Sequence, residues 1–150
     1  MNTYVREYLV LLSSCAAVCL LAACVTTRTE SLRASASRLD DASRHFSSEI
    51  QYQGDDSRRG RVSRDAEALA KAAHNLDRAL DQGKSRDDVE SDYRRVTESY
   101  DQVHSQLADE GYAEQNRRVL EDFDRVTAAY RDVEAGMSRR SASSRDSGRT

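Results

Sequence analysis

Beyond residue 24, apolar side chains recur at alternating steps of three and four residues in four successive runs. A step that averages 3.5 residues places each run on one face of an α-helix, whereas a half-buried strand would alternate at every second residue. The 150-residue chain contains no proline, so the residue that most often ends a helix is absent from every run. The runs are Leu32, Ala36, Leu39, Ser43, Phe46 and Ile50; Val62, Ala66, Leu69, Ala73, Leu76 and Leu80; Val89, Tyr93, Val96, Tyr100, Val103 and Leu107; and Tyr112, Asn116, Val119, Phe123, Val126, Tyr130, Val133 and Met137. Ser43 and Asn116 are the polar exceptions to the pattern. The sequence therefore predicts an all-α protein.

Glycines and capping residues separate the four runs. A glycine follows the last turn of each run, where a residue with positive φ commonly closes a helix: Gly54, Gly83, Gly111 and Gly136. Thr27 and Glu30 have the spacing of a capping box, and Ser85 stands before the third run. We expect helices over residues 28–52, 57–82, 86–109 and 113–135.

The connections between these helices are short, which favours antiparallel neighbours. The simplest prediction is an up-down-up-down antiparallel four-helix bundle over residues 28–136. A long helical hairpin that dimerises is the alternative, and the regular glycine-marked connections favour the bundle. Residues 137–150 carry four arginines against one aspartate and almost no apolar side chain, so they are predicted to form a disordered basic tail.

The N-terminal segment is apolar from Tyr8 to Ala23, apart from two serines, and follows the single cation Arg6. This run is short for a membrane span, which needs about 20 residues, and it fits the core of a signal peptide. It ends in Leu21-Ala22-Ala23-Cys24, which resembles the lipobox of bacterial lipoproteins. The resemblance covers only the first 24 residues, and the acidic Glu7 departs from the usual cationic leader.

The lipobox resemblance implies cleavage before Cys24 and attachment of a diacylglycerol and an acyl chain such as palmitate to that cysteine. Residues 1–23 are then a signal peptide and residues 24–27 a lipidated tether. Two alternatives are a lipobox ending at Cys15, which leaves too few apolar residues before it, and an uncleaved membrane anchor. The residue after the cysteine is Val25. Among enterobacterial lipoproteins, the absence of an aspartate at this position resembles the pattern of those sorted to the outer membrane. The domain is expected to face the periplasm.

Composition and motifs exclude several classes of function. The 23 basic residues are outnumbered by 26 acidic ones, which argues against a nucleic-acid binder. Cleavage removes Cys15 and Cys19, so no thiol remains for a disulfide, a cysteine metal site or catalysis. The chain has no Gly-x-Ser-x-Gly elbow, Ser-x-x-Lys pair or phosphate-binding glycine loop, and we expect no enzyme.

The histidines and tyrosines have structural interpretations. His45, His74 and His104 each lie beside a core position, and the Glu-x-x-His pairs of di-iron bundles are absent, so no metal or cofactor is predicted. A metal- or haem-binding bundle is retained as a second alternative. Four tyrosines in core register are expected to fill the core, although they also suit an apolar pocket: Tyr93, Tyr100, Tyr112 and Tyr130.

One charged cluster lacks a structural explanation. Six arginines fall near the starts of the second and fourth helices, which an up-down bundle brings to one end: Arg58, Arg59, Arg61, Arg64, Arg117 and Arg118. A cation near a helix N-terminus interacts unfavourably with the helix dipole, and each one lowers the stability of the helix by about 0.3–1 kcal/mol. The arginines predict an anionic partner, such as the carboxylates of peptidoglycan, or another envelope protein, unless nearby acidic residues neutralise them.

The sequence as a whole predicts a lipid-anchored, non-enzymatic structural or interaction module of the bacterial cell envelope. The main alternative is a periplasm-facing helical chaperone or envelope-stress sensor. The Leu-Thr-x-x-Gln motif of one family of such chaperones is absent from the chain.

Overall fold

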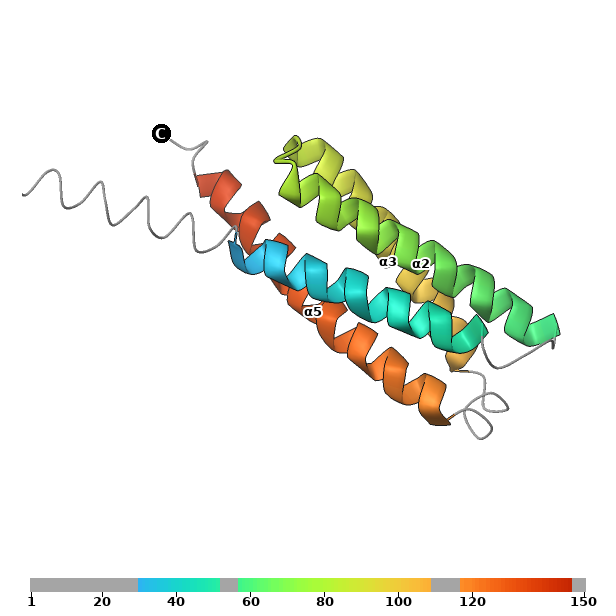
Figure 1. Cartoon of the computed structure of the whole chain (residues 1–150). Helices are drawn as coiled ribbons and strands as arrows, with labels where there is room; N and C mark the ends of the chain where they lie inside the picture. The colour runs from blue at the N-terminus through green and yellow to red at the C-terminus, as the bar shows by residue number, and fades with distance from the viewer. Residues whose placement is uncertain (1–29, 52–56, 109–116, 147–150) are drawn as a thin grey trace, which may run out of the picture. The chain divides into compact units, whose positions relative to one another are not determined.

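The computed structural model describes residues 30–51, 57–108 and 117–146, with side chains given for residues 30–51, 60–108 and 117–142. This described part contains four helices and no strand: residues 30–51, α2 (Ser57–Asp81), α3 (Arg86–Leu107) and α5 (Arg117–Asp146). Figure 1 shows them as a helical bundle, with the helix over residues 30–51 in blue to cyan. The chain divides into two units, Met1–Ser31 and Leu32–Thr150, and the bundle belongs to the second. The all-α prediction is confirmed.

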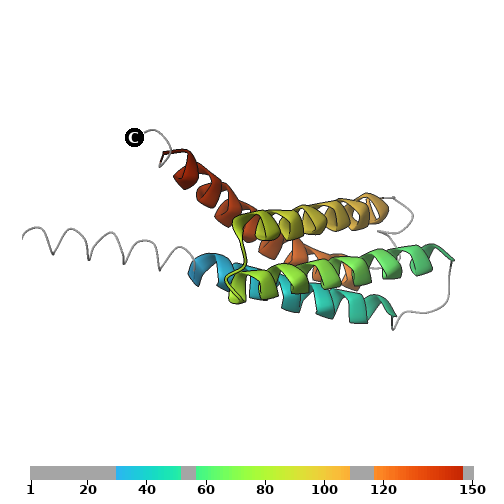
Figure 2. The same cartoon turned by 90° about the horizontal axis from the view of Figure 1, so that it is seen from above.

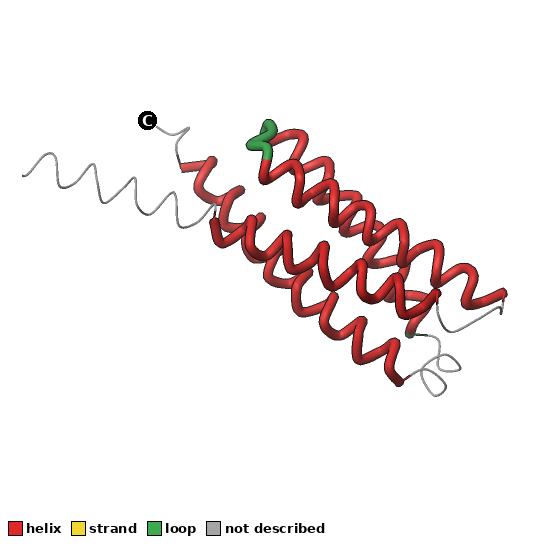
Figure 3. Tube along the Cα trace, viewed as in Figure 1, coloured by secondary structure: helices red, strands yellow, loops and turns green. Residues whose placement is uncertain are grey.

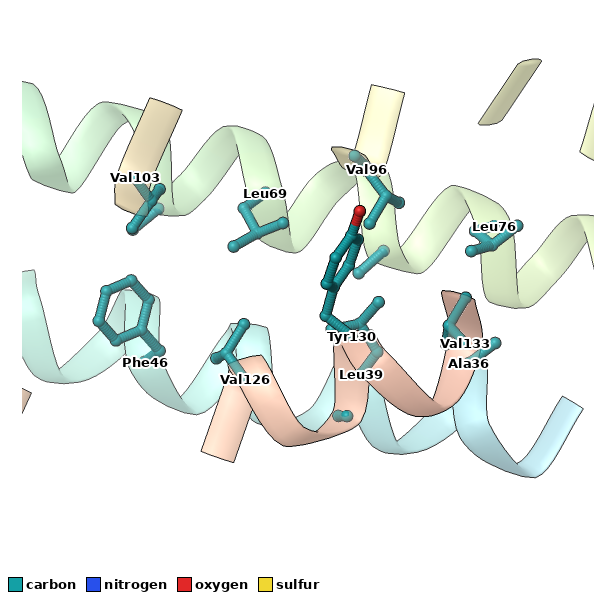
Figure 4. Close-up of a cluster of buried hydrophobic side chains, with 14 of the residues drawn as sticks. Ala36, Leu39, Phe46, Leu69, Leu76, Val96, Val103, Val126, Tyr130 and Val133 are labelled. Atoms are coloured by element: carbon teal, nitrogen blue, oxygen red, sulfur yellow. The ribbon is translucent and has the colours of Figure 1, made fainter. Parts of the chain in front are cut away.

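The core is formed by the four predicted runs. Their described members are buried, except that Tyr93 and Tyr100 are half-buried and pack against the core. Figure 4 shows side chains from all four helices pointing into one interior, among them Phe46, Leu69, Val96 and Val126. Each large apolar side chain removed from water contributes about 1.5–3 kcal/mol, so this shared interior is what holds the helices together. Tyr112 and Asn116 lie outside the described residues.

Contacts between the helices define which ones are neighbours. The helix over residues 30–51 meets α2 where Arg33 Nε donates to the Leu80 carbonyl at 3.0 Å. The same helix meets α5 at the ring pair Phe46–Phe123, whose centroids lie 5.3 Å apart. α2 packs along α3, and α3 meets α5 at stacked tyrosine rings described below. The tube in Figure 3 shows the loop between α2 and α3 joining these helices at one end of the bundle.

The α2–α3 connection has the predicted capping chemistry. Gly83 has φ of +62°, the Gly83 amide donates to the Leu80 carbonyl at 3.2 Å, and the Lys84 amide donates to the Ala79 carbonyl at 2.9 Å. These two bonds form a Schellman motif, which satisfies carbonyls that the end of a helix leaves free. Ser85 then caps α3, since its Oγ accepts from the Asp88 amide at 3.2 Å. The Thr27 cap, Gly54 and Gly111 lie outside the described residues.

The predicted C-terminal boundary is wrong. Gly136 does not end a helix: α5 continues through it to Asp146, so residues 137–146 are helical where the sequence predicted a disordered tail. A glycine inside a helix costs only about 1 kcal/mol relative to alanine, and no proline follows to stop the helix. A Cβ added at Gly136 would lie 2.7 Å from Cδ1 of Leu32. The glycine therefore allows a close approach to the first helix, and Met137 is still buried beyond it.

Within the described ranges, none of the helices has the length and apolar character needed to cross a bilayer. Cys24 and the apolar segment before it lie outside those ranges.

Candidate functional site

The arginine cluster predicted from the sequence lies where α2 and α5 begin. Figures 1 and 2 show both helices starting at the end of the bundle where the helix over residues 30–51 ends. We call this the arginine end, and its members are Arg58, Arg59, Arg61, Arg64, Arg117 and Arg118. Arg58 and Arg59 lie in the first turn of α2, before the described side chains begin. Arg61, Arg64, Arg117 and Arg118 are all exposed to solvent.

The charge at these two helix starts is opposite to what the helix dipole favours. The first turns of α2 and α5 contain no acidic residue, and arginines occupy two positions in each. α3 has the favoured arrangement, with Ser85 as its cap and Asp87 and Asp88 in its first turn. Because a helix N-terminus carries partial positive charge, acidic residues stabilise it and cations destabilise it. The helix dipole therefore gives no reason for the arginines.

Few contacts neutralise the arginine end in the described structure. Arg117 Nε lies 3.3 Å from Glu121 Oε1, with both side chains largely exposed, and such a surface pair contributes little to stability. Arg64 Nε donates to the Gly60 carbonyl at 3.0 Å. Asp65 Oδ2 instead accepts a hydrogen bond from Gln106 Nε2 on α3. Several acidic residues near this end lie outside the described part: Asp55, Asp56, Asp109, Glu110 and Glu114.

His74 belongs to a polar cluster between the first helix and α2. Arg44 makes two 2.8 Å bonds to the buried carboxylate of Asp40. His74 Nδ1 lies 3.2 Å from the same carboxylate and 2.7 Å from Arg44 Nη2. This nitrogen can donate to Asp40 or accept from Arg44, but it cannot do both. Burial and the nearby carboxylate of Asp40 raise the pKa of Asp77, which lies one turn further along α2.

The other two histidines have separate surroundings. His45 Nδ1 lies 3.7 Å from Asp122 of α5, whose carboxylate also accepts from Arg125 at 2.9 Å. His104 is exposed, and its ring stacks on Tyr100 at a centroid distance of 5.9 Å. Across the described helices, no group of three or more histidine, cysteine or acidic side chains is placed to hold a metal ion. The three histidines are thus spread over different contacts.

The tyrosines form a column of rings between α3 and α5. The Tyr100 and Tyr130 centroids are 4.2 Å apart, and Tyr93 and Phe123 continue the stack on either side at 6.5 and 5.4 Å. Tyr100 Oη lies 3.1 Å from Thr127 Oγ1, and Tyr130 Oη donates to Thr97 Oγ1 at 3.2 Å. The stacked rings therefore fill the space between α3 and α5. The hydroxyl groups of Tyr100 and Tyr130 form hydrogen bonds with threonines at the rim.

Burial and the neighbouring Tyr130 hydroxyl raise the pKa of Tyr93 to about 12. A tyrosine with such a pKa is neutral at physiological pH, so its ring brings no charge into the column there. The aromatic column contributes packing and hydrogen bonds to the core.

Sequence reasoning missed the two buried carboxylates, Asp40 and Asp122. Each has an arginine on its own helix at helical spacing, Arg44 and Arg125, which the sequence alone makes visible. The histidine that approaches each carboxylate comes from a different helix, 34 residues away in the case of His74. That pairing depends on how the helices align, which apolar spacing alone does not specify.

Comparison of the chain with protein-family models gives no match, and neither does comparison with characterised proteins or with solved structures. The case for a function rests on the residues of this chain.

Proposed function

We propose that this protein is a bacterial lipoprotein, anchored through Cys24, that acts as a non-enzymatic interaction module of the cell envelope. The apolar segment ending in Leu21-Ala22-Ala23-Cys24 supports the anchor. The first described helix starts at residue 30, so only a few residues separate it from Cys24, at most about 3.6 Å each when extended. Such a tether keeps the bundle close to the leaflet. Val25 favours the outer membrane, with the bundle facing the periplasm.

We infer that the four helices are arranged up-down-up-down and antiparallel. Two contacts between the first helix and α2 support this, because Arg33 bonds near residue 80 while Asp40 lies by His74. Two contacts with α5 have the same sense, since Arg38 pairs with Asp132 at 3.3 Å and Phe46 with Phe123. As residue numbers rise along the first helix, they fall along both neighbours. The short connections predicted from the sequence agree with this arrangement.

In this arrangement the arginine end lies away from the membrane, where it faces the cell wall. The observation that carries the proposal is the contrast between helix starts: arginines and no acidic residue at α2 and α5, a serine cap and two aspartates at α3. A surface that opposes helix stability is better explained by binding. Peptidoglycan presents carboxylates, which arginine recognises with paired hydrogen bonds. We propose peptidoglycan as the partner of the arginine end.

The test is charge reversal at the two helix starts, by changing Arg58, Arg59, Arg117 and Arg118 to glutamate. The matched control reverses four exposed arginines elsewhere on the bundle: Arg78, Arg94, Arg95 and Arg131. Both variants change the net charge equally. Sedimentation with purified peptidoglycan should be lost in the first variant and reduced far less in the control.

Stability separates binding from folding in this experiment. Glutamate in the first turn favours the helix dipole, so the arginine-end variant should unfold at the same temperature as the parent protein or higher. A loss of sedimentation then cannot result from unfolding. Equal sedimentation of parent, variant and control would refute the role of the arginine end, and no sedimentation of the parent would refute peptidoglycan as its partner.

A further inference from the structure

α5 is the longest of the described helices, with 30 residues against 25 in α2 and 22 in α3. Its core contacts end at Met137, the last buried residue of the described chain. Residues 138–146 continue as helix, and we call them the α5 extension. Figures 1 and 2 show this extension, in red, running past the loop between α2 and α3. At 1.5 Å per residue it adds about 14 Å of helix.

The α5 extension has a composition unlike that of the rest of the bundle. It contains serines, one alanine and three arginines, Arg139, Arg140 and Arg145, with Asp146 as the only acidic residue. Arg139 is exposed and Arg140 half-exposed. The extension has no apolar stripe that another helix or a protein groove would bury. Its distinguishing property is positive charge on a short helix.

The position of the extension follows from its contact with the first helix. Gly136 packs against Leu32, so the extension begins beside the start of the helix over residues 30–51. The chain from Cys24 to Leu32 is eight residues long, which spans at most about 28 Å. If Cys24 carries the lipid, as proposed above, the extension begins within a few tens of ångströms of the membrane surface.

We propose that the α5 extension binds the anionic headgroups of the membrane that holds the lipid anchor, and thereby sets the orientation of the bundle. Each arginine or lysine close to an anionic lipid surface strengthens association about fivefold. Three arginines do not replace an acylated anchor, but they add a second point of attachment on the bundle itself. A single lipid attachment leaves the orientation of a domain open, whereas two attachments restrict it.

The inference rests on the proposed anchor for its geometry. The orientation of the bundle can be tested with a fluorophore attached at a single cysteine. The mature protein has no cysteine besides the lipidated Cys24, so Ser138→Cys, at an exposed position of the extension, introduces a single labelling site. Ser105→Cys, exposed near the end of α3, is the matched probe at the other end of the bundle. The mature lipoprotein is labelled with a fluorophore and reconstituted into phosphatidylcholine vesicles with or without phosphatidylglycerol.

The expected result is protection of the Ser138→Cys label from an aqueous quencher only when phosphatidylglycerol is present, with loss of protection at high salt. The Ser105→Cys label should remain accessible in both vesicles. Arg139→Glu with Arg140→Glu should abolish the protection, whereas Arg94→Glu with Arg95→Glu on exposed positions of α3 should preserve it. Equal quenching in both vesicles, or protection that survives reversal of Arg139 and Arg140, would overturn the proposal.

Vesicle flotation distinguishes this inference from the proposed anchor. If the protein does not float with phosphatidylcholine vesicles, the anchor is wrong. Binding by the extension would still appear as flotation that requires phosphatidylglycerol and is lost on reversal of Arg139 and Arg140. If the protein floats with neutral vesicles but the label shows no dependence on anionic lipid, the anchor stands and the role of the extension fails.

Discussion

Ser43 occupies a core position of the first helix although it is the one polar member of its run. Its side chain is fully buried, and its Oγ has no hydrogen-bond partner among the described residues. Burying a hydroxyl group without a partner costs about 1–3 kcal/mol in proteins. Its position in the 3.5-residue spacing places it on the core face, and its polarity is an unfavourable feature of an otherwise apolar layer.

Replacing Ser43 with alanine should therefore raise the free energy of unfolding by about 1 kcal/mol. The substitution removes the unpaired hydroxyl group, and this gain exceeds the loss of packing from one atom. Urea denaturation measures the change. Ser37→Ala, at an exposed position of the same helix, is the control for helix propensity alone. A loss of stability in Ser43→Ala but not in Ser37→Ala would indicate that the hydroxyl group has a partner outside the described residues.

The phenol of Tyr93 makes stability depend on alkaline pH. Its pKa is raised from 10.0 to about 12, first by burial and then by the Tyr130 hydroxyl. Between these values the unfolded chain loses the Tyr93 proton and the folded chain keeps it, so unfolding becomes more favourable as pH rises. The contribution is complete below the unfolded pKa of 10.0 and is lost progressively as pH rises toward about 12.

Difference absorbance in the near ultraviolet should record this late ionisation in the folded protein. Tyr93→Phe should remove the late component and reduce the fall in unfolding free energy across the same pH window. An identical alkaline profile in parent and variant would contradict the raised pKa.

At the scale of elements, three glycines of the described helices and their ends have different roles. Gly83 has positive φ at the end of α2, and Gly136 permits the approach of α5 to Leu32. Gly60 lies inside α2, and a Cβ added there would meet nothing within 4 Å. The sequence marked Gly83 and Gly136 alike as helix ends. It could not separate them, because the difference is a contact with a residue about 100 positions away.

Gly60→Ala and Gly83→Ala should change stability in opposite directions. Alanine at position 60 should stabilise α2 by about 0.5–1 kcal/mol, because glycine loses more conformational entropy in a helix and the space is open. Alanine at position 83 should destabilise by about 1–2 kcal/mol, because a side chain disfavours the left-handed conformation. Thermal unfolding of both variants measures the effects. Destabilisation of similar size at both positions would contradict the assigned roles.

The helices themselves were well predicted because their cause is local. The 3.5-residue spacing and Ser85 specify α3 to within two residues of its observed end at Leu107. The predicted C-terminal end of the last helix is wrong because the polar composition of residues 137–146 does not by itself end a helix. A chain that has already formed a helix can continue through polar residues without a new nucleation cost.

At the scale of the whole molecule, the fold class follows from the sequence more directly than any site does. Apolar spacing specifies which face of each helix is buried, and this accounts for the common interior. Polar contacts such as Asp40–His74 and His45–Asp122 depend on the axial alignment of two helices. The apolar spacing does not specify this alignment, because a shift by whole turns keeps the same face buried. Grouping the arginines of the arginine end required only the positions of two helix starts, whereas its role as a binding surface stays a prediction.

The proposed location in the cell envelope depends on the proposed lipid anchor, which can be tested on the whole chain. Cys24→Ser removes the thiol that would carry the diacylglycerol, so labelling with palmitate should be abolished and the unprocessed precursor should accumulate. Cys15→Ser is the matched control, because it changes a cysteine inside the predicted signal peptide and should leave processing and labelling intact. Electrophoretic mobility and lipid labelling in a bacterial host measure both outcomes. If Cys24→Ser matures normally and retains the lipid label, or if Cys15→Ser loses it, the lipidation site is not Cys24.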